Sequence, residues 1–384
     1  MAKGVIIDSE SPKKVIRLSK SCIGRSEKNA VMGVLDREFF GMGAEVKQFE
    51  EALSEFFCRP AVCVINGTAA LHLALQSCGI GRGDEVLVPS LTYVASFQAI
   101  SATGAKPVAC DVDARTLTLN WQDAEQRLTP NTRAVMPVHY AGGVGELDAI
   151  YSFARSNGLR VIEDAAHAFG STYHGRRIGS FGEVACFSFD GIKNITSGEG
   201  GCVVTDDEAV LQRVRDTRLL GVKNDTQKRY ADQRSWDFDV TDQGWRYHMS
   251  NLMGAIGLVQ LQRFSEMAEV RQKLASLYDT CLTGHACIEC FAHDYEAVVP
   301  HIYVVRIHGL KDRRALRSRL LERGIQTGVH YQPNHLLTCY CDHAITPLVV
   351  TDTVSSEMLS LPLHPDLTEC DVRYICNQLM SVLD

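Results

Sequence analysis

The chain has 384 residues, of which 45% are hydrophobic and 22% are charged, and its formal net charge is −7 at pH 7. This length accommodates one large domain or two, and the composition is typical of a soluble globular protein. The acidic balance, without a basic block, argues against nucleic-acid binding. No apolar run is long enough to span a bilayer, and the N-terminal segment has no apolar core of a signal peptide. We therefore expect a cytoplasmic protein that is not attached to a membrane.

The fourteen cysteines are scattered along the chain, and many stand among apolar residues. In such positions cysteine behaves as a small hydrophobic residue, and in a cytoplasmic protein we expect the thiols to be reduced. Cys287 and Cys290 form a CxxC pair, but no second pair follows at a zinc-binding spacing. We therefore predict no metal site.

The first half of the chain begins with a helical pattern over residues 28–57, broken at 39–43. A short apolar strand over 62–65 then leads into Asn66-Gly67-Thr68, and a second helix runs from there to a stop at Gly79. A strand, a small polar turn and a helix N-terminus form a favourable anion site, because free N–H groups and the helix dipole point at one spot. The alternative is an ordinary helix capped by Asn66 or Thr68.

Strands and helices then alternate up to residue 220. The strands are expected at 85–89, 106–111, 133–138, 159–162, 184–189 and 201–204, and the helices at 92–103, 121–128 (capped by Asn120), 146–157 and 207–220. Because each strand is apolar throughout, both faces of the sheet should be covered. The pattern predicts an α/β fold with a mostly parallel sheet flanked by helices.

The second half of the chain changes character. Residues 222–247 are polar and irregular, and residues 249–282 have the apolar spacing of one long helix that bridges two domains. A strand over 298–307, a helix over 311–323, a short strand up to His330, a loop and a helix over 369–383 follow. We predict a large domain over residues 1–250, and a bridging helix with a smaller α+β domain over residues 251–384.

Three unusual features follow strands of the large sheet: the 66–68 turn, the acidic pair Glu163-Asp164, and Lys193. Ligands of parallel sheets bind beyond the carboxyl ends of the strands, so these features should converge on one edge. Lys193 follows an apolar strand and precedes the glycine-rich run 196–201. A desolvated lysine amine loses its proton readily and becomes a nucleophile toward carbonyls. The alternative is a structural lysine that reaches solvent.

A lysine of this kind could carry pyridoxal phosphate (PLP) and move a proton once its amine is released. Gly67 and Thr68 suit the cofactor phosphate, with Ser188 as a third donor. Asp164 suits the ring nitrogen, because a carboxylate beside it favours the protonated ring.

Two aromatic side chains complete the predicted cofactor site. Tyr93 could stack on the ring, and His167 could reach the side of the ring that carries the hydroxyl. Each has a simpler alternative: Tyr93 and His167 could be packing residues, Asp164 a helix cap, and Glu163 a residue that only shapes its turn.

The assembled motifs resemble the DegT/DnrJ/EryC1/StrS family of sugar aminotransferases, which are PLP enzymes of fold type I, over nearly the whole chain. The motifs are Asn66–His72 for the phosphate turn, Glu163–His167 for the ring nitrogen, and Cys186–Phe189, Lys193-Asn194 and Gly198–Gly201 around the lysine. The resemblance implies a seven-stranded large-domain sheet and a homodimer with active sites at the subunit interface. It also implies a nucleotide-linked ketosugar as amino acceptor, L-glutamate as donor, and a role in glycan (for example O-antigen) biosynthesis.

The chain departs from the family pattern at residues 244–250. Arg246 stands where the family usually has an asparagine that reaches a neighbour's cofactor phosphate, and His248 replaces the usual arginine. The guanidinium of Arg246 could form a bidentate, charge-assisted hydrogen-bond pair with the phosphate. Relatives that carry histidine instead of the lysine perform dehydration, and the presence of Lys193 argues against that activity here.

Residues 328–336 resemble the family's sugar-proximal motif, in a version closer to enzymes that aminate C4 than C3. His330, Tyr331 and His335 are thus candidate substrate contacts, the alternative being a polar loop with surface histidines. Amination at C3 and a PLP-binding regulator without turnover remain alternatives. A nicotinamide oxidoreductase is disfavoured, because no G-x-G-x-x-G follows the first strand.

Overall fold

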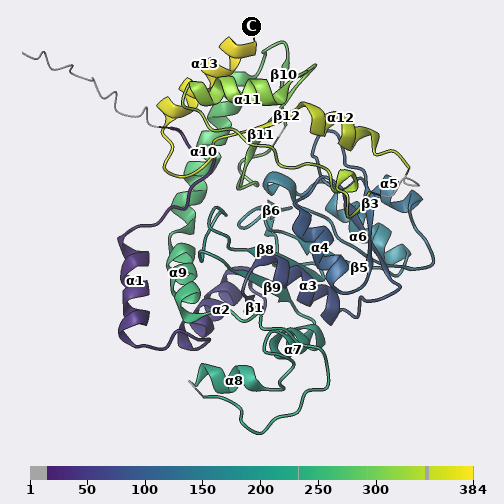
Figure 1. Ribbon diagram of the computed structural model, residues 1–384, viewed down its shortest axis with the longest axis vertical. Helices are drawn as coiled ribbons and strands as arrows, with labels where there is room; N and C mark the ends of the chain where they lie inside the picture. The colour runs from purple at the N-terminus through teal and green to yellow at the C-terminus, as the bar shows by residue number, and fades with distance from the viewer. Residues whose placement is uncertain (1–14, 232, 292, 342–345, 384) are drawn as a thin grey trace, which may run out of the picture.

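The protein is built around a seven-stranded sheet (Figure 1). The computed structural model describes residues 15–231, 233–291, 293–341 and 346–383. The strand order is β1-β9-β8-β5-β4-β2-β3; β9 is antiparallel to both of its neighbours, and all other adjacent pairs are parallel. The strands are β1 (Ala61–Val64), β2 (Glu85–Pro89), β3 (Lys106–Cys110), β4 (Thr132–Val135), β5 (Arg160–Asp164), β8 (Val184–Ser188) and β9 (Gly201–Thr205).

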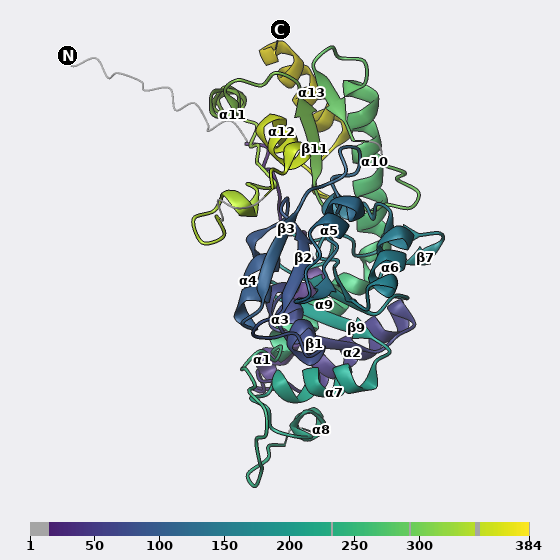
Figure 2. The ribbon, with the colours of Figure 1, turned by 90° about the vertical axis from the view of Figure 1, so that its right-hand side faces the viewer.

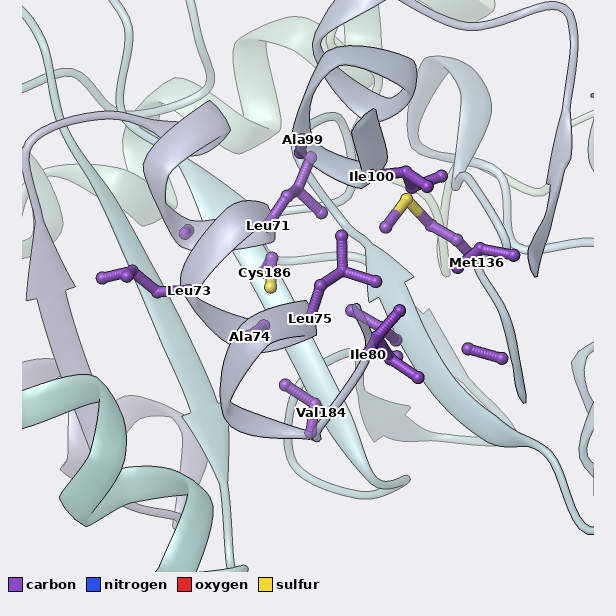
Figure 3. Close-up of a cluster of buried hydrophobic side chains, with 14 of the residues drawn as sticks. Leu71, Leu73, Ala74, Leu75, Ile80, Ala99, Ile100, Met136, Val184 and Cys186 are labelled. Carbon is purple, nitrogen blue, oxygen red and sulfur yellow. The ribbon is translucent and has the colours of Figure 1, made fainter. Parts of the chain in front are cut away.

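Helices cover both faces of this sheet, which explains the uninterrupted apolar strands. Along β1, Val62 and Val64 face one core while Ala61 and Cys63 face another, following the two-residue period of a strand. The first face carries α3 (Gly67–Ser77), α4 (Val94–Ala102) and α7 (Glu208–Thr217), and the second carries α2 (Ala44–Phe57), α5 (Trp121–Gln126) and α6 (Leu147–Ser156). Figure 3 shows Leu71 and Leu75 of α3 in the first core, close to Cys186 and Val184 of β8.

A second, three-stranded sheet lies at the far end of a long helix (Figure 2). Its strands are antiparallel, in the order β10-β11-β12. The elements are α9 (Asn251–Gln262), α10 (Phe264–Leu282), β10 (Ile288–Cys290), β11 (Tyr303–Ile307), α11 (Arg313–Glu322), α12 (Val349–Glu357), β12 (Met358–Leu361) and α13 (Glu369–Leu383). Beside α9 lies α1 (Arg25–Asp36), and two small elements complete the large part: the β6 (Thr172–Tyr173) and β7 (Arg176–Arg177) hairpin and α8 (Asp225–Tyr230).

The structure confirms the predicted α/β class with its mostly parallel sheet, and it confirms two predicted helix starts. Asn66 accepts a hydrogen bond from the amide of Ala69, and Asn120 accepts one from the amide of Asp123. The prediction of one helix over residues 249–282 is wrong, because α9 ends and α10 begins at Arg263. Residues 222–247 also contain α8, and α12 and β12 occupy part of the expected loop.

No helix within the described residues is long and apolar enough to cross a membrane. Among those same residues, no group of three His, Cys, Asp or Glu side chains has the arrangement of a metal site. Residues 1–14, on which the expectation about a signal peptide largely rests, lie outside the described part of the chain.

Candidate active site

A cavity of about 450 Å³ lies where β5 and β8 end and where α3 and α4 begin. This is the carboxyl edge of the parallel strands, as the sequence predicts. Most of the predicted site residues meet here, from five separate segments of the chain: Gly67, Thr68, Tyr93, Asp164, His167, Ser188, Lys193, His330 and Tyr331.

Lys193 lies in the turn between β8 and β9, where its amide donates a hydrogen bond to the carbonyl of Asp190. Burial of its amine lowers the pKa to about 8, although the nearby carboxylates of Asp164 and Asp190 act in the opposite direction. Much more of this amine is therefore neutral near pH 7 than of an ordinary lysine. A neutral, enclosed amine is the state that attacks a carbonyl.

Asp164 is the last residue of β5, and only 6% of it is exposed. Its Oδ2 accepts a hydrogen bond from the Ser96 hydroxyl at 2.7 Å, and its Oδ1 accepts one from the Ala166 amide at 3.2 Å. The carboxylate thus lines the cavity with a fixed orientation, which is what a partner for a protonated ring nitrogen requires.

The N-terminus of α3 forms the predicted anion cradle. The side chain of Asn66 caps the helix by accepting a hydrogen bond from the Ala69 amide. The earlier amides of the first turn have no partner within the helix. A Cβ added at Gly67 would lie only 2.7 Å from Cβ of Ser188, so only glycine keeps this turn against β8. The turn, the helix dipole and the Thr68 and Ser188 hydroxyls at the cavity wall fit a phosphate group.

His167 connects the cofactor side of the cavity to its opposite wall. Its Nδ1 accepts a hydrogen bond from the Ala141 amide, and its Nε2 lies 2.9 Å from the hydroxyl of Tyr331. Burial, followed by the charges of Lys193 and His330, holds the His167 pKa well below its ordinary value. The ring is therefore neutral, with its proton on Nε2, and it donates to the Tyr331 oxygen. The hydroxyl proton of Tyr331 is left free to point into the cavity.

His330 and Tyr93 line the same cavity. Nδ1 of His330 is 2.8 Å from the Ser360 hydroxyl, and burial, followed by the charge of Lys193, lowers the His330 pKa to about 4. Tyr93 is the N-cap residue of α4 and is 59% exposed, with its ring centroid 5.5 Å from that of Tyr331. An exposed ring on the cavity wall is free to cover a flat ligand.

Two predicted site residues lie elsewhere. Arg246 is exposed and does not line the cavity of its own chain. His335 follows the cavity loop, but its Nδ1 lies 2.7 Å from the Ser90 hydroxyl and its Nε2 lies 3.0 Å from Asp352. Both ring nitrogens of His335 are thus engaged in holding the loop against β2 and α12.

Four residues that the sequence did not single out for the site belong to it. Asp190, Glu199 and His301 line the cavity, and Ser96 holds Asp164 from behind. Asp190 and Glu199 lie within six residues of Lys193 in the sequence, so this short spacing was a usable signal. His301 comes from a distant segment with no motif, and nothing in the sequence connects it to this site.

The fold and this cavity together define a pyridoxal-phosphate enzyme of fold type I. A sequence profile of the DegT/DnrJ/EryC1/StrS aminotransferase family matches residues 21–380, and the chain belongs to this family of PLP-dependent sugar aminotransferases. The protein is therefore a transferase, and the family is the one that the sequence resemblance predicted.

Solved structures support this assignment. The aminotransferase TlmJ from Streptoalloteichus hindustanus is 33% identical, with a TM-score of 0.88 over 96% of this chain and 98% of that one. Spr1654 from Streptococcus pneumoniae, described as a sugar aminotransferase, is 30% identical in its PLP form, with a TM-score of 0.86 over 96% of this chain and 98% of that one. PseC from Helicobacter pylori, an aminotransferase involved in pseudoaminic acid biosynthesis, is 25% identical, with a TM-score of 0.88 over 96% and 99% of the two chains.

Proposed function

We propose that the protein transfers the amino group of L-glutamate to a nucleotide-linked 4-keto-6-deoxyhexose in the cytoplasm, and so makes an aminosugar for glycan biosynthesis. The observation that carries this proposal is the single cavity in which Lys193, Asp164 and the α3 N-terminus meet the loop of His330 and Tyr331. The first set suits the cofactor, and the loop offers neutral hydrogen-bonding groups that suit sugar hydroxyls. The 4-keto preference rests on the resemblance of residues 328–336.

Each cofactor-side residue has a proposed role. Gly67, Thr68 and Ser188 hold the phosphate, Asp164 keeps the ring nitrogen protonated, and Lys193 carries the cofactor. The bound cofactor supplies the electron sink that makes amine transfer possible. When a substrate amine displaces Lys193 from the cofactor, the freed lysine amine would move the proton between the substrate carbon and the cofactor.

Two further side chains lie at the remaining edges of the cofactor site. Tyr93 covers the face of the ring, and His167, which is neutral, donates its Nε2 proton toward Tyr331 and so keeps the Tyr331 hydroxyl directed at the ligand. The donor and acceptor use the pocket in turn, as in a ping-pong reaction.

We also propose that a second copy of the chain completes the site. Among the described side chains that line the cavity, Lys193 is the lone lysine or arginine, whereas three are carboxylates: Asp164, Asp190 and Glu199. Glutamate and a nucleotide diphosphate are both anionic, so this cavity needs cations from elsewhere. Arg246, exposed and outside its own cavity, is the proposed source in the partner.

An apolar groove of about 520 Å³ provides a surface on which the second copy could pack. It lies along α1 and α9, includes Ile23, Val31 and Ile256, and leaves Met32 54% exposed. An exposed apolar groove beside a site that lacks cations favours a homodimer with shared active sites. Within each copy, we propose a large domain over residues 1–250, and a bridging helical segment (α9 and α10) with a smaller domain over residues 251–384.

Two half-reactions test the chemistry. The purified holoenzyme should change its cofactor absorbance on addition of glutamate, and it should then aminate dTDP- or UDP-linked 4-keto-6-deoxyglucose, as detected by mass spectrometry. Lys193→Ala should fold but give no product. If only a 3-ketosugar gives product, the enzyme aminates C3 and the proposal of C4 amination is wrong. If the protein binds the cofactor but turns over neither glutamate nor any ketosugar, the alternative of a PLP-binding regulator without turnover is favoured.

Subunit mixing tests the shared site. Lys193→Ala and Arg246→Ala homodimers should each have little activity, but a mixture re-equilibrated to random pairs should recover about a quarter of wild-type activity, since half of the dimers are mixed and each of these has one intact site. Recovery fails if Arg246 acts within its own chain. Light scattering that gives a monomer would contradict the dimer itself.

A further inference from the structure

Two hydroxyl groups, of Thr92 and Ser96, form a hydrogen-bonded chain that ends on the carboxylate of Asp164. The Ser96 hydroxyl is 2.7 Å from Oδ2 of Asp164, and the Thr92 hydroxyl is 2.9 Å from that of Ser96. Ser96 is fully buried and Thr92 is 1% exposed, so water does not compete for these bonds. None of the predicted roles of the site residues uses this pair.

The direction of the two hydrogen bonds follows from the chemistry of the groups. A carboxylate only accepts hydrogen bonds, so the Ser96 hydroxyl is the donor in its bond to Asp164. The carbonyl of Tyr93, at 3.4 Å, is the more distant acceptor. The Thr92 hydroxyl must then donate to Ser96. Consecutive bonds with the same direction polarise each other and strengthen the terminal bond to the carboxylate.

The backbone at Thr92 is held by the loop that carries the proposed substrate contacts. Asn334 is fully buried, and its side-chain amide donates to the carbonyl of Thr92 at 2.8 Å and to that of Ser90 at 3.1 Å. The segment that leads into α4 is thereby held in place just before the helix turn that carries Ser96.

We propose that Ser96, supported by Thr92, is a positioning residue that keeps Asp164 ionised, so that the shared proton resides on the cofactor ring nitrogen rather than on the carboxylate. Hydrogen bonds donated to a carboxylate stabilise its ionised form. Without Ser96, Asp164 becomes a stronger base and withdraws the proton from the ring, which weakens the electron sink. This inference rests on the proposed role of Asp164.

The test follows the proton directly. Holoenzyme reconstituted with PLP labelled with ¹⁵N in the ring gives a nitrogen chemical shift that reports whether the ring nitrogen is protonated. In Ser96→Ala the ratio of ring-bound to carboxylate-bound proton should fall about tenfold, equivalent to one pKa unit. From a wild-type ratio of about 100 to 1, the shift should then move toward neutral pyridine by about a tenth of the full span, and by more from a smaller ratio.

Further variants separate positioning from general structural damage. The dissociation constant of PLP should rise about tenfold in Ser96→Ala, less in Thr92→Val, and little in Ser96→Thr, which keeps the hydroxyl. Ser101→Ala, at the exposed end of the same helix, is the matched control and should behave as wild type. A Ser96→Ala protein with lower thermal stability but an unchanged ¹⁵N shift would overturn the proposal.

Asp164→Asn separates this inference from the proposed role of Asp164. An amide cannot hold the ring proton in place, so the ¹⁵N shift of this variant should be that of neutral pyridine. If Asp164→Asn shows this change and Ser96→Ala does not, the positioning role of Ser96 is wrong and the role of Asp164 stands. If neither variant changes the shift, the role of Asp164 is wrong as well.

Discussion

The protonation of Lys193 provides a quantitative test of the site in the absence of any substrate. Burial lowers the pKa of this amine from 10.5 to about 8. At pH 7 about 9% of the amine is then neutral, against about 0.03% for an ordinary lysine, a difference of about 300-fold in nucleophile concentration. A structural lysine that reaches solvent would show no such advantage.

Competitive labelling of the apoenzyme measures this difference. Acetic anhydride is small and reacts with neutral amines, so mass spectrometry of the lysine peptides across pH gives a separate titration for each side chain. The Lys193 peptide should reach half of its maximal labelling near pH 8. Lys273 is a control whose pKa shifts in the opposite direction, because its hydrogen bond with Glu369 raises the pKa above 10.5. Its peptide should therefore label at higher pH than that of Lys193.

The Asp190→Asn variant checks the sign of the electrostatic contribution. The Asp190 carboxylate favours the protonated amine, so its removal should move the Lys193 midpoint to lower pH. A wild-type midpoint near 10.5 would refute the argument that burial of Lys193 makes it reactive. A midpoint that rises in Asp190→Asn would refute the electrostatic part alone.

Two other changes test the framework around the site. Glu50→Gln leaves the fully buried Arg218 without its ion-pair partner, and should lower the free energy of unfolding by about 3–5 kcal/mol in urea titrations; a loss below about 1 kcal/mol would show that Arg218 does not depend on this charge. Gly67→Ala should raise the PLP dissociation constant at least about tenfold, because the new carbon lies 2.7 Å from Ser188 and the phosphate turn must move. Gly41→Ala, where nothing lies within 4 Å of the added carbon, is the control; equal PLP binding by the two variants would contradict the close-approach argument.

The sequence predicted the large sheet well because its signals are local. Apolar strands, the cap residues Asn66 and Asn120, and the glycine stop after α3 all act within a few residues of the element that they define. The site motifs shared this advantage, since each follows its own strand and parallel strands end at one edge. Topology alone then brought Asp164, Lys193 and Gly67 together.

The elements that the sequence missed depend on distant partners. The first turn of α12 is capped by Asp111, which accepts hydrogen bonds from the amides of Val350 and Thr351 and from the Thr351 hydroxyl. About 240 residues separate the cap from this helix, and the helix itself is rich in β-branched residues, so no local signal marked it. The break at Arg263 likewise coincides with a tertiary ion pair, to Glu27, rather than with Gly or Pro.

Desolvation lowers the pKa of the lysine and of the histidines in the cavity, but the chemical consequence differs between them. It is the first cause of the lowered pKa of Lys193, His167, His301 and His330. For the lysine the result is a nucleophile, and for the histidines it is neutrality; in His167 the Ala141 amide, which donates to Nδ1, then places the single ring proton on Nε2. Had these rings been charged, they would repel the lysine cation and His167 could no longer accept from the Ala141 amide. The same burial therefore favours both the reactive amine and the hydrogen-bond direction that leaves the Tyr331 proton free for a ligand.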